Sequence, residues 1–245
     1  DDFIEDNLGP NVHLDWITKA NAPTILKTRF IDNYTKTKTI GVYDLNDELL
    51  NTGEESELRT KIEHCVDHYD LVTVVDYGHG LVTQSVIDIL QERSTYLAVN
   101  AQLNSFNFGY RTISKYKKVN YVCVHEGELR HDYRNRSDTL EHLVKSLSSQ
   151  INADVILITQ GNMGSLAFDN AEFTKCPAYA VSVVDRIGAG DTLLAITSLC
   201  FAAGLPIDVT LFLGNIVAAE MIASMGTGLR LQKSNVLRTV ESLLK

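Results

Sequence analysis

A single carboxylate follows three small residues within the run VVDRIGAGDTLLAITSLC, which covers residues 183–200. Gly188, Ala189 and Gly190 add almost no bulk to the backbone, and the apolar residues after them predict a buried helix. The first N–H groups of a helix have no internal acceptor and lie at the positive end of the helix dipole. The sequence therefore predicts an anion site here, and phosphate is the anion that such sites most often hold.

Asp191 comes next, although its negative charge stands beside a site suited to anions. Phosphoryl transfer needs donors for the charge on the transferred group and an acceptor for the proton of the attacking hydroxyl. The N–H groups around Gly188, Ala189 and Gly190 are the candidate donors, and Asp191 is the candidate acceptor. The alternative is a carboxylate that only stabilises the helix terminus, by about 0.5–2 kcal/mol. The local sequence favours neither role.

Strands that alternate with helices must position these residues. The predicted strands cover residues 24–31, 38–45, 71–76, 95–100, 119–124 and 154–159, with short antiparallel strands within 164–182. The predicted helices cover residues 54–69, 83–92, 137–150, 189–203, 207–224 and 234–244. This alternation predicts one α/β domain over residues 1–245, with a parallel sheet covered by helices on both faces. The turn-like DNYTKT makes the first two strands a hairpin.

Ligands bind beyond the carboxyl ends of the strands in such a sheet, and polar loops fall at these ends. DYGHG carries Asp76, and VHEGELR (124–130) carries His125, Glu126 and Glu128. In TQGNMG, Gly161 and Gly164 leave room for a flat or phosphorylated ligand. With DRIGAGD, these loops predict a ligand that carries phosphate and a divalent cation. Glu128 offers hard oxygen ligands, which suit Mg²⁺.

Other motifs have plainer interpretations. The sequence contains neither G-x-x-x-x-G-K-[ST] nor a G-x-G-x-x-G after a strand, so a P-loop and a dinucleotide fingerprint are absent. His64 and His68 have the spacing of a metal pair on a helix, but a solvated helix face is favoured. Lys27 and Arg29 alternate along the hairpin, either as exposed charges or as anion contacts. Taken alone, TQGNMG is more typical of a hairpin turn than of a nucleotide site.

Composition excludes several classes of protein. A formal net charge of −9 argues against a general nucleic-acid binder, because phosphate backbones require a basic surface. The four cysteines form no CxxC pair, which predicts reduced thiols in a cytoplasmic protein. No apolar run reaches the roughly 18 residues that a membrane span needs. The acidic opening DDFIEDNLGP is unlike a signal peptide, and this abrupt start predicts a chain that is part of a longer protein.

DRIGAGDT resembles the C-terminal signature of the ribokinase-like (PfkB) carbohydrate kinases, D-x-x-G-A-G-D-[TS]. TQGNMGS is similar to the family's T-x-G-x-x-G nucleotide segment, and HEGE falls where the family has N-x-x-E, which helps to organise Mg²⁺. VVDYGHG and PTILKTRFI resemble the SDYGKG and P-T-x-x-K-T-R-x-I segments of its heptose-phosphate kinase branch. These segments occur in the family's order from residue 23 to about residue 228.

The resemblance implies a ribokinase-like fold with a small β lid at about residues 24–45, and transfer of the ATP γ-phosphoryl group to a hydroxyl of a sugar or sugar phosphate. It also implies a fused or associated nucleotidyltransferase domain and a homodimer paired through the lid strands. From the charge and the apolar runs, we expect no nucleic acid or membrane as partner. Carried over by position, the implied roles are: Asp191 as the base; Gly188, Ala189 and Gly190 as the anion hole; Glu128 for the metal; Thr159, Gly161 and Gly164 along the nucleotide; Asn215 near the adenine; and Lys27, Arg29 and Asp76 facing the sugar.

The sequence also departs from the family pattern. His125 stands in place of the usual Asn, Ile187 replaces a Thr, Val42 falls near the place of an Arg, and NAQL (100–103) stands where heptose kinases read D-P-K-G. The family's N-terminal Gly-Gly segment and sugar-binding Asp are not in these residues, so we expect the kinase domain to be incomplete at its N-terminus. A second hypothesis is therefore a non-catalytic relative that binds a nucleotide or sugar phosphate and regulates or scaffolds a fused domain. A third is an oligomerisation module that uses the lid strands.

Overall fold

The centre of the molecule is a mostly parallel sheet with the strand order β3-β4-β5-β6-β7-β8. The structure, a computed structural model, describes residues 2–34, 37–103, 110, 112–185, 187–223 and 231–245. Strands β3 to β6 are parallel, and β7 and β8 continue the sheet in antiparallel fashion. The strands are β3 (Val72–Asp76), β4 (Leu97–Ala101), β5 (Lys118–His125), β6 (Asn152–Thr159), β7 (Ser165–Phe168) and β8 (Phe173–Cys176).

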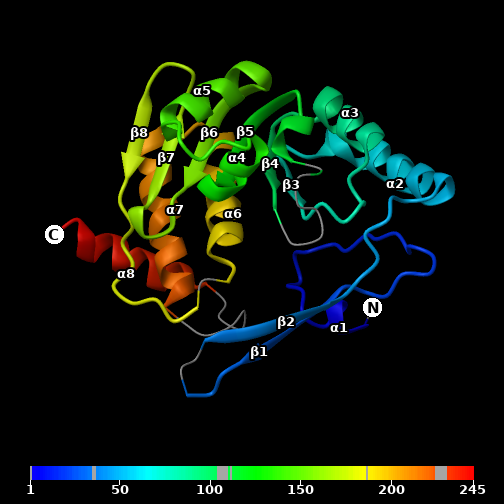
Figure 1. The fold of residues 1–245 in the computed structure, drawn as a ribbon, viewed down its shortest axis with the longest axis horizontal. Helices are drawn as coiled ribbons and strands as arrows, with labels where there is room; N and C mark the ends of the chain where they lie inside the picture. Colours follow the sequence, from blue (N-terminus) through cyan, green and yellow to red (C-terminus); the bar gives the residue numbers. More distant parts are fainter. Residues whose placement is uncertain (1, 35–36, 104–109, 111, 186, 224–230) are drawn as a thin grey trace.

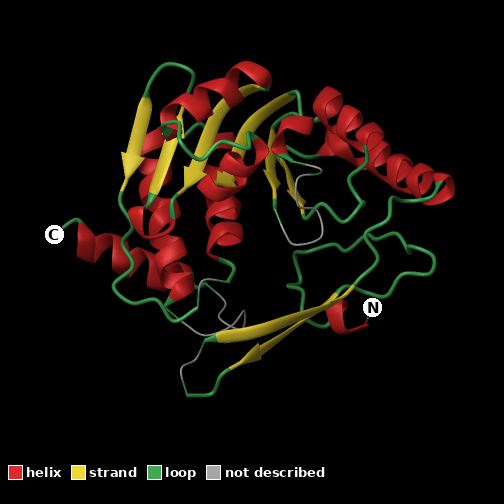
Figure 2. Ribbon diagram, in the orientation of Figure 1, coloured by secondary structure: helices red, strands yellow, loops and turns green. Residues whose placement is uncertain are grey.

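Helices cover both faces of this sheet, which confirms the predicted fold class (Figures 1 and 2). Neighbouring residues of a strand point to opposite faces. Val122 thus packs with the buried residues of α3, α4 and α5, whereas Tyr121 and Cys123 pack with those of α6 and α7. The helices are α1 (Asp2–Glu5), α2 (Thr52–Cys65), α3 (Gln84–Arg93), α4 (Glu126–Asp132), α5 (Leu140–Gln150), α6 (Ala189–Ala202), α7 (Ile207–Ile222) and α8 (Lys233–Leu243).

The structure differs from the sequence prediction in three segments. The expected loop VHEGELR (124–130) instead contains the end of β5 and most of the short helix α4. The helix expected over 54–69 ends at Cys65 and continues as a 3-10 turn, Val66–His68. Residues 177–182 lie outside the strands that were expected within 164–182. Within the described ranges, none of the helices has the length and apolar character required to span a membrane.

A separate antiparallel hairpin, β1 (Leu26–Ile31) and β2 (Lys38–Asp44), lies below the sheet (Figure 1). The parallel strands run toward it, so their carboxyl ends face the hairpin (Figure 2). Its pairing sets Phe30 opposite Ile40 and Thr28 opposite Val42, which puts these side chains on one face. Phe30, Ile40 and Val42 are each more than half exposed. The hairpin predicted from the sequence is confirmed, and one of its faces is apolar and uncovered.

The base of the hairpin is fixed to the turn that follows β3. Gly80 has a φ of +86°, and a Cβ at this position would lie 2.2 Å from the carbonyl oxygen of Glu48. Only glycine fits such a close approach of two backbones. On the other side, the Lys19 ammonium donates to the carbonyl oxygens of Asn46 (3.0 Å) and Glu48 (2.6 Å). The segments that enter and leave the hairpin are therefore tied to each other and to the core.

Candidate active site

A cleft of about 630 Å³ opens at the carboxyl ends of β4, β5 and β6, against the start of α6 and the side of α7. This is the edge at which parallel α/β sheets bind ligands. The structure brings most of the sequence-predicted site residues into its lining: Glu128, Thr159, Gly161, Gly164, Ala189, Gly190, Asp191 and Asn215. Gly188 is the N-cap of α6, directly before this lining.

The backbone turn before α6 presents free N–H groups to the cleft. Gly188 is left-handed, with a φ of +81°, and offers no side chain as a cap. Thr192 has the first N–H that finds a helical acceptor, the carbonyl oxygen of Gly188 at 2.9 Å. Over the ranges that the structure describes, no acceptor meets the N–H groups of Ala189, Gly190 or Asp191. They are available to an anion at the positive end of a long helix.

Contacts behind this turn hold it in place. The carboxylate of Asp185 accepts a hydrogen bond from the Ile187 N–H at 3.0 Å. The N–H groups of Val184 and Asp185 donate to the carbonyl oxygen of Ile222, the last residue of α7, at 2.8 and 3.2 Å. The turn is thus anchored through α7 before any ligand arrives, which is the preorganisation that electrostatic catalysis requires.

Asp191 is exposed in the first turn of α6 and lines the cleft. Its charge is felt by three neighbours. Burial raises the pKa of Tyr77, and the charge of Asp191 adds to that rise. Asp191 also contributes to the raised pKa values of Glu128 and Cys123, after burial as the main cause. A cationic or hydroxyl-bearing ligand would therefore meet a carboxylate at the place where the free N–H groups of α6 begin.

Glu128 faces the same cleft from α4. One carboxylate oxygen accepts from the His125 N–H at 2.7 Å, and the other accepts from the Leu103 N–H at 3.0 Å. Burial raises the pKa of this carboxyl, the two N–H donors oppose the rise, and the charge of Asp191 adds to it. Each oxygen keeps a second lone pair that is free to meet a cation.

The residues fit Mg²⁺ held by carboxylate and phosphate together. Among the residues described, no group of three His, Cys, Asp or Glu side chains is arranged to hold a metal ion. Mg²⁺ commonly uses only one or two carboxylates, with water and substrate phosphates completing its shell. Glu128, with Asp191 in the same cleft lining, matches that smaller requirement.

The TQGNMG segment joins β6 to β7 along another wall of the cleft. The Gln160 N–H donates to the carbonyl oxygen of Gly164 at 2.8 Å. Gly161 and Gly164 have φ values of +60° and +92°. A Cβ on Gly164 would lie 2.0 Å from the carbonyl oxygen of Cys176. Asn215, from α7, donates to the Ser165 hydroxyl at 2.7 Å and to the Leu211 carbonyl at 2.8 Å, so its amide nitrogen is engaged within the protein.

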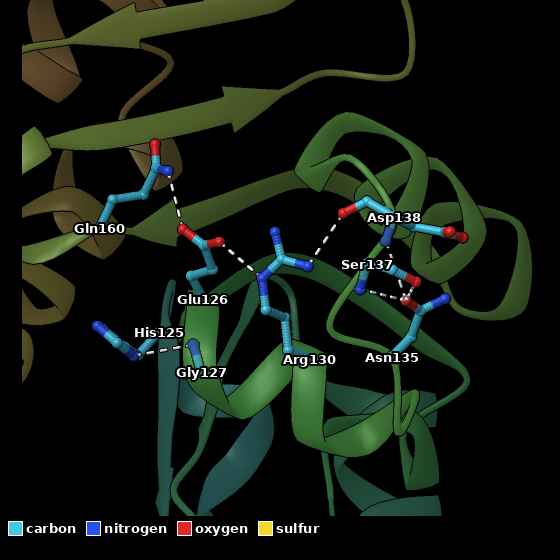
Figure 3. Close-up of polar contacts among 8 residues, drawn as sticks. All are labelled: His125, Glu126, Gly127, Arg130, Asn135, Ser137, Asp138 and Gln160. Atoms are coloured by element: carbon cyan, nitrogen blue, oxygen red, sulfur yellow. Dashed lines mark hydrogen bonds and ion pairs between the residues drawn. The ribbon is translucent and has the colours of Figure 1, made fainter.

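A polar bridge links this segment to α4, as Figure 3 shows. Glu126 accepts from the Gln160 side chain at 2.9 Å and from the Arg130 guanidinium at 2.7 Å. Burial alone would raise the pKa of Glu126, but the hydrogen bonds from Gln160 and Arg130 outweigh it, and the pKa is lowered. Arg130 also donates to the Asp138 carbonyl at 3.0 Å. The bridge fixes Gln160, a lining residue, on the rim of the cleft.

The three residues expected to face a sugar lie outside the cleft lining. Lys27 and Arg29 are on β1, and the Lys27 ammonium lies 4.7 Å from the ring centre of Tyr77. The charge of Asp191 adds to the raised pKa of Tyr77, so Tyr77 is the residue that connects Lys27 of the hairpin to the region of Asp191. Contact of Lys27 and Arg29 with a substrate stays a prediction.

Asp76 is nearly inaccessible, with 3% of its surface exposed. Its carboxylate accepts from the Tyr116 hydroxyl and the Gly78 N–H, each at 2.9 Å, and it pairs with the Lys115 ammonium. These contacts occupy the carboxylate within the protein. A role for Asp76 in holding a sugar stays a prediction, and the contacts visible here hold the loop after β3.

Sequence reasoning missed several lining residues. Asn100 and Cys123 lie at the ends of β4 and β5, and the Asn100 amide donates to the Cys123 carbonyl at 2.8 Å. Tyr179 lies in the loop after β8. Asn100 could have been predicted as a site residue, because it is a polar residue at the end of an apolar strand. Cys123 and Tyr179 could not have been predicted from the sequence, because their positions depend on the order of the strands in the sheet and on the path of the loop.

Comparisons with known proteins agree with this architecture. The chain is 26% identical over 216 residues to the bifunctional protein HldE of Shewanella baltica, which covers 86% of the chain and 43% of that relative. It is 27% identical over 219 residues to the bifunctional protein HldE of Bradyrhizobium diazoefficiens, with 87% and 43% coverage. The chain thus spans less than half the length of these curated relatives.

Solved structures share the fold at low sequence identity. Phosphofructokinase-2 from Escherichia coli, in complex with potassium, matches with a TM-score of 0.74 and 13% identity, over 89% of this chain and 71% of that one. Ribokinase from Arabidopsis thaliana, complexed with ribose and ATP, matches with a TM-score of 0.67 and 15% identity, over 93% and 72%. The family model for the pfkB family carbohydrate kinases matches residues 2–234. The shared fold is consistent with the family match, which covers most of the chain, and the chain belongs to the pfkB family of carbohydrate kinases.

Proposed function

We propose that this chain transfers the γ-phosphoryl group of ATP to a hydroxyl of a sugar or sugar phosphate. The observation that supports this most is the meeting of two features in one cleft. The exposed carboxylate of Asp191 stands in the same helical turn as the free N–H groups of Ala189 and Gly190. A transferred phosphoryl group needs such donors, and the incoming alcohol needs such an acceptor.

In the proposed reaction Asp191 accepts the proton of the attacking hydroxyl. The sugar oxygen then forms a bond to the γ-phosphorus, and the bond between that phosphorus and the β,γ-bridging oxygen breaks, which leaves ADP. The N–H groups of Ala189 and Gly190 donate to the oxygens of the transferred group. Because Asp185 and Ile222 hold this turn, the donors need little reorganisation during the reaction.

Thr159, Gly161 and Gly164 are proposed to lie along the nucleotide, with Asn215 near the adenine. Glu128 would hold Mg²⁺ together with the phosphates, and the ion would supply charge neutralisation at those oxygens. The glycines allow a flat ligand to approach the backbone closely. The bridge from Glu126 to Gln160 keeps this wall in place.

For the acceptor we propose a heptose-phosphate-like sugar, with Lys27 and Arg29 on the sugar side. The motif order of the heptose-phosphate kinase branch supports this choice, and so does the similarity to the HldE proteins. Those relatives are bifunctional by name. The proposed partner is accordingly a fused or associated nucleotidyltransferase domain. A screen of phosphorylated sugars against the full-length protein, read by ADP release, tests the acceptor.

The substitution D191N tests the proposed base. Its amide is similar in shape to the carboxylate but accepts no proton, so we expect kcat to fall by about 100-fold or more while ADP affinity stays nearly unchanged. ADP release gives kcat, and titration calorimetry gives the affinity. D208N is a matched control, because Asp208 is an exposed acid in the first turn of α7 and lies outside the cleft lining.

Unchanged turnover in D191N would refute the assignment of Asp191 as base. If the unaltered protein binds ADP but phosphorylates none of the sugars tested, a non-catalytic nucleotide-binding relative becomes the better description. Absence of ADP binding would remove the nucleotide site itself from the proposal.

A further inference from the structure

Glu126 follows the lining residue His125 but is not itself part of the cleft lining. Its two carboxylate oxygens have different partners, as Figure 3 shows. One oxygen accepts from the Gln160 side chain at 2.9 Å, and the other accepts from the Arg130 guanidinium at 2.7 Å. Arg130 is fixed in turn by its hydrogen bond to the Asp138 carbonyl. Glu126 is therefore held from its own helix and reaches across to the nucleotide segment.

This bridge joins two segments that diverge at the edge of the sheet. His125 of β5 and Thr159 of β6 are the last residues that these two strands pair. Beyond them the chain of β5 enters α4, whereas the chain of β6 enters a 3-10 turn. The ladder of the sheet ends before Glu128, and the hydrogen bond from Gln160 to Glu126 connects the two segments beyond that point.

The charge of Glu126 is balanced at the rim of a cleft that is proposed to hold phosphates. Gln160 brings a neutral amide to the cleft lining, and the carboxylate behind it is paired with Arg130. Burial opposes ionisation of Glu126, but the hydrogen bonds from Gln160 and Arg130 lower its pKa. A charged acceptor makes a stronger hydrogen bond than a neutral one. The bridge therefore holds the Gln160 side chain more firmly than a neutral partner would.

Mg²⁺ makes the spacing of these two segments important. The ion requires near-octahedral geometry, with oxygen ligands at about 2.0–2.1 Å. A carboxylate and a phosphate can share it only when their separation lies within narrow limits. Groups that orient a metal ligand without touching the ion commonly change its affinity. Glu126 has such a place, because it precedes Glu128 in the first turn of α4 and bonds to Gln160 of the nucleotide segment.

We propose that Glu126 is a positioning residue that sets the spacing between Glu128 and the nucleotide segment. The Glu128 carboxylate and the nucleotide phosphates can then bind one Mg²⁺ together. This inference rests on the proposed function, because it takes Glu128 to hold the ion and Gly161 and Gly164 to lie along the nucleotide. Glu126 touches neither the ion nor the nucleotide and acts through Gln160.

Two variants break the bridge from opposite ends. Q160M removes the amide at nearly constant length, and E126M/R130M removes the acceptor together with its ion-pair partner, which leaves the net charge unchanged. R59M/E63M is the matched control, because Arg59 and Glu63 form an ion pair with the same spacing on α2, outside the cleft lining. Titration calorimetry measures ADP affinity in excess Mg²⁺ and in EDTA, and thermal unfolding checks that each variant is folded.

In the unaltered protein we expect Mg²⁺ to strengthen ADP binding. In Q160M and in E126M/R130M, ADP affinity in Mg²⁺ should fall about tenfold, which is the smaller of the losses typical for groups that orient a metal ligand. ADP affinity in EDTA should change little, so that the gain from Mg²⁺ is lost. R59M/E63M should keep both affinities.

The proposal is overturned if both bridge variants keep the gain from Mg²⁺, or if they lose ADP affinity equally in Mg²⁺ and in EDTA. Loss of the gain in only one of them would also overturn it, because the bridge needs both ends. If E126M/R130M melts early, E126D takes its place, since it keeps the charge and shortens the reach. Retention of the gain in E126D then contradicts the proposal, and loss supports it.

Two results with the unaltered protein separate this inference from the proposed function. Absence of ADP binding contradicts the proposed function itself. ADP binding that Mg²⁺ does not strengthen leaves the nucleotide site in place and overturns the spacing role of Glu126.

Discussion

At the scale of one residue, Cys123 shows how burial lowers the reactivity of a thiol. It lines the cleft, yet only 2% of it is exposed. Burial raises the pKa of its thiol to about 12; a hydrogen bond with Tyr121 opposes the rise, and the charges of Glu128 and Asp191 add to it. About one thiol in ten thousand is then ionised at pH 8, and only the thiolate is a strong nucleophile.

We therefore expect iodoacetamide at pH 8 to modify exposed Cys65 and to leave Cys123 intact in the folded protein. Peptide mass spectrometry after timed quenching measures both sites. Reaction of all four cysteines in guanidinium is the control for reagent and detection. Modification of Cys123 at a rate close to that of Cys65 would contradict both its burial and its raised pKa.

The sequence could predict the site residues whose chemistry depends on the local backbone. The glycines before Asp191 and in TQGNMG indicate positions where the chain turns sharply. Most of these glycines line one cleft. Their roles in binding and transfer stay predictions. Asp76 was different, because its partners Lys115 and Tyr116 are about 40 residues away in the chain, and no local pattern reveals that its carboxylate is engaged.

At the scale of elements, α4 is a helix that the sequence pattern did not predict. Its capping box uses His125, whose Nδ1 atom replaces the hydroxyl or carboxylate oxygen of a usual N-cap, with Glu128 at the third position. Ser, Thr, Asp and Asn are the N-cap residues that indicate the start of a helix in a sequence. The loop expected over residues 124–130 was therefore wrong where α4 begins, although Glu128 fitted the box. The long strands and helices, with strong apolar periodicity, were predicted within a few residues.

The β6–β7 turn offers a paired test of backbone geometry. Gly164 and Gly161 both have positive φ, but only Gly164 would place a Cβ against backbone atoms. We expect G164A to lower the free energy of unfolding by more than about 2 kcal/mol, through overlap with the Cys176 carbonyl added to strain. G161A should lose about 1 kcal/mol, from the left-handed conformation alone. Urea unfolding measures both, and equal losses would show that β8 yields to the added methyl group.

At the scale of the whole molecule, the hairpin leaves an apolar face uncovered. Phe30, Ile40 and Val42 share that face, with Lys27 and Tyr43 on the opposite one. A soluble protein seldom exposes such a surface without a partner. The resemblance implies that this partner is a second copy of the chain.

We expect the unaltered protein to sediment as a dimer and F30D to sediment as a monomer, because dimer formation would bury the added charge. V181D is the control, since Val181 is fully exposed in a loop outside the hairpin. Sedimentation velocity at several protein concentrations measures the change. An F30D protein that sediments like the unaltered one would place any dimer contact elsewhere.

The fold class was predictable from the alternation of elements, whereas the placement of the hairpin as a lid was implied only by the family resemblance. The residue pattern of the hairpin does not itself show that the carboxyl ends of β3 to β6 face it. That arrangement depends on Gly80 and on the contacts of Lys19, which join segments far apart in the chain.

The close approach of Gly80 to the Glu48 carbonyl has a consequence for how the hairpin can move. Because Asn46 and Glu48 are both held, the outgoing leg of the hairpin has only Leu45 between β2 and its anchor. The incoming leg has the longer stretch of residues 20–25 between Lys19 and β1. An element that is held by one short and one long connection rotates about the short connection. Any arc that the hairpin sweeps over the cleft therefore pivots at Leu45, and the strand ends farthest from it, Ile31 of β1 and Lys38 of β2, travel the greatest distance.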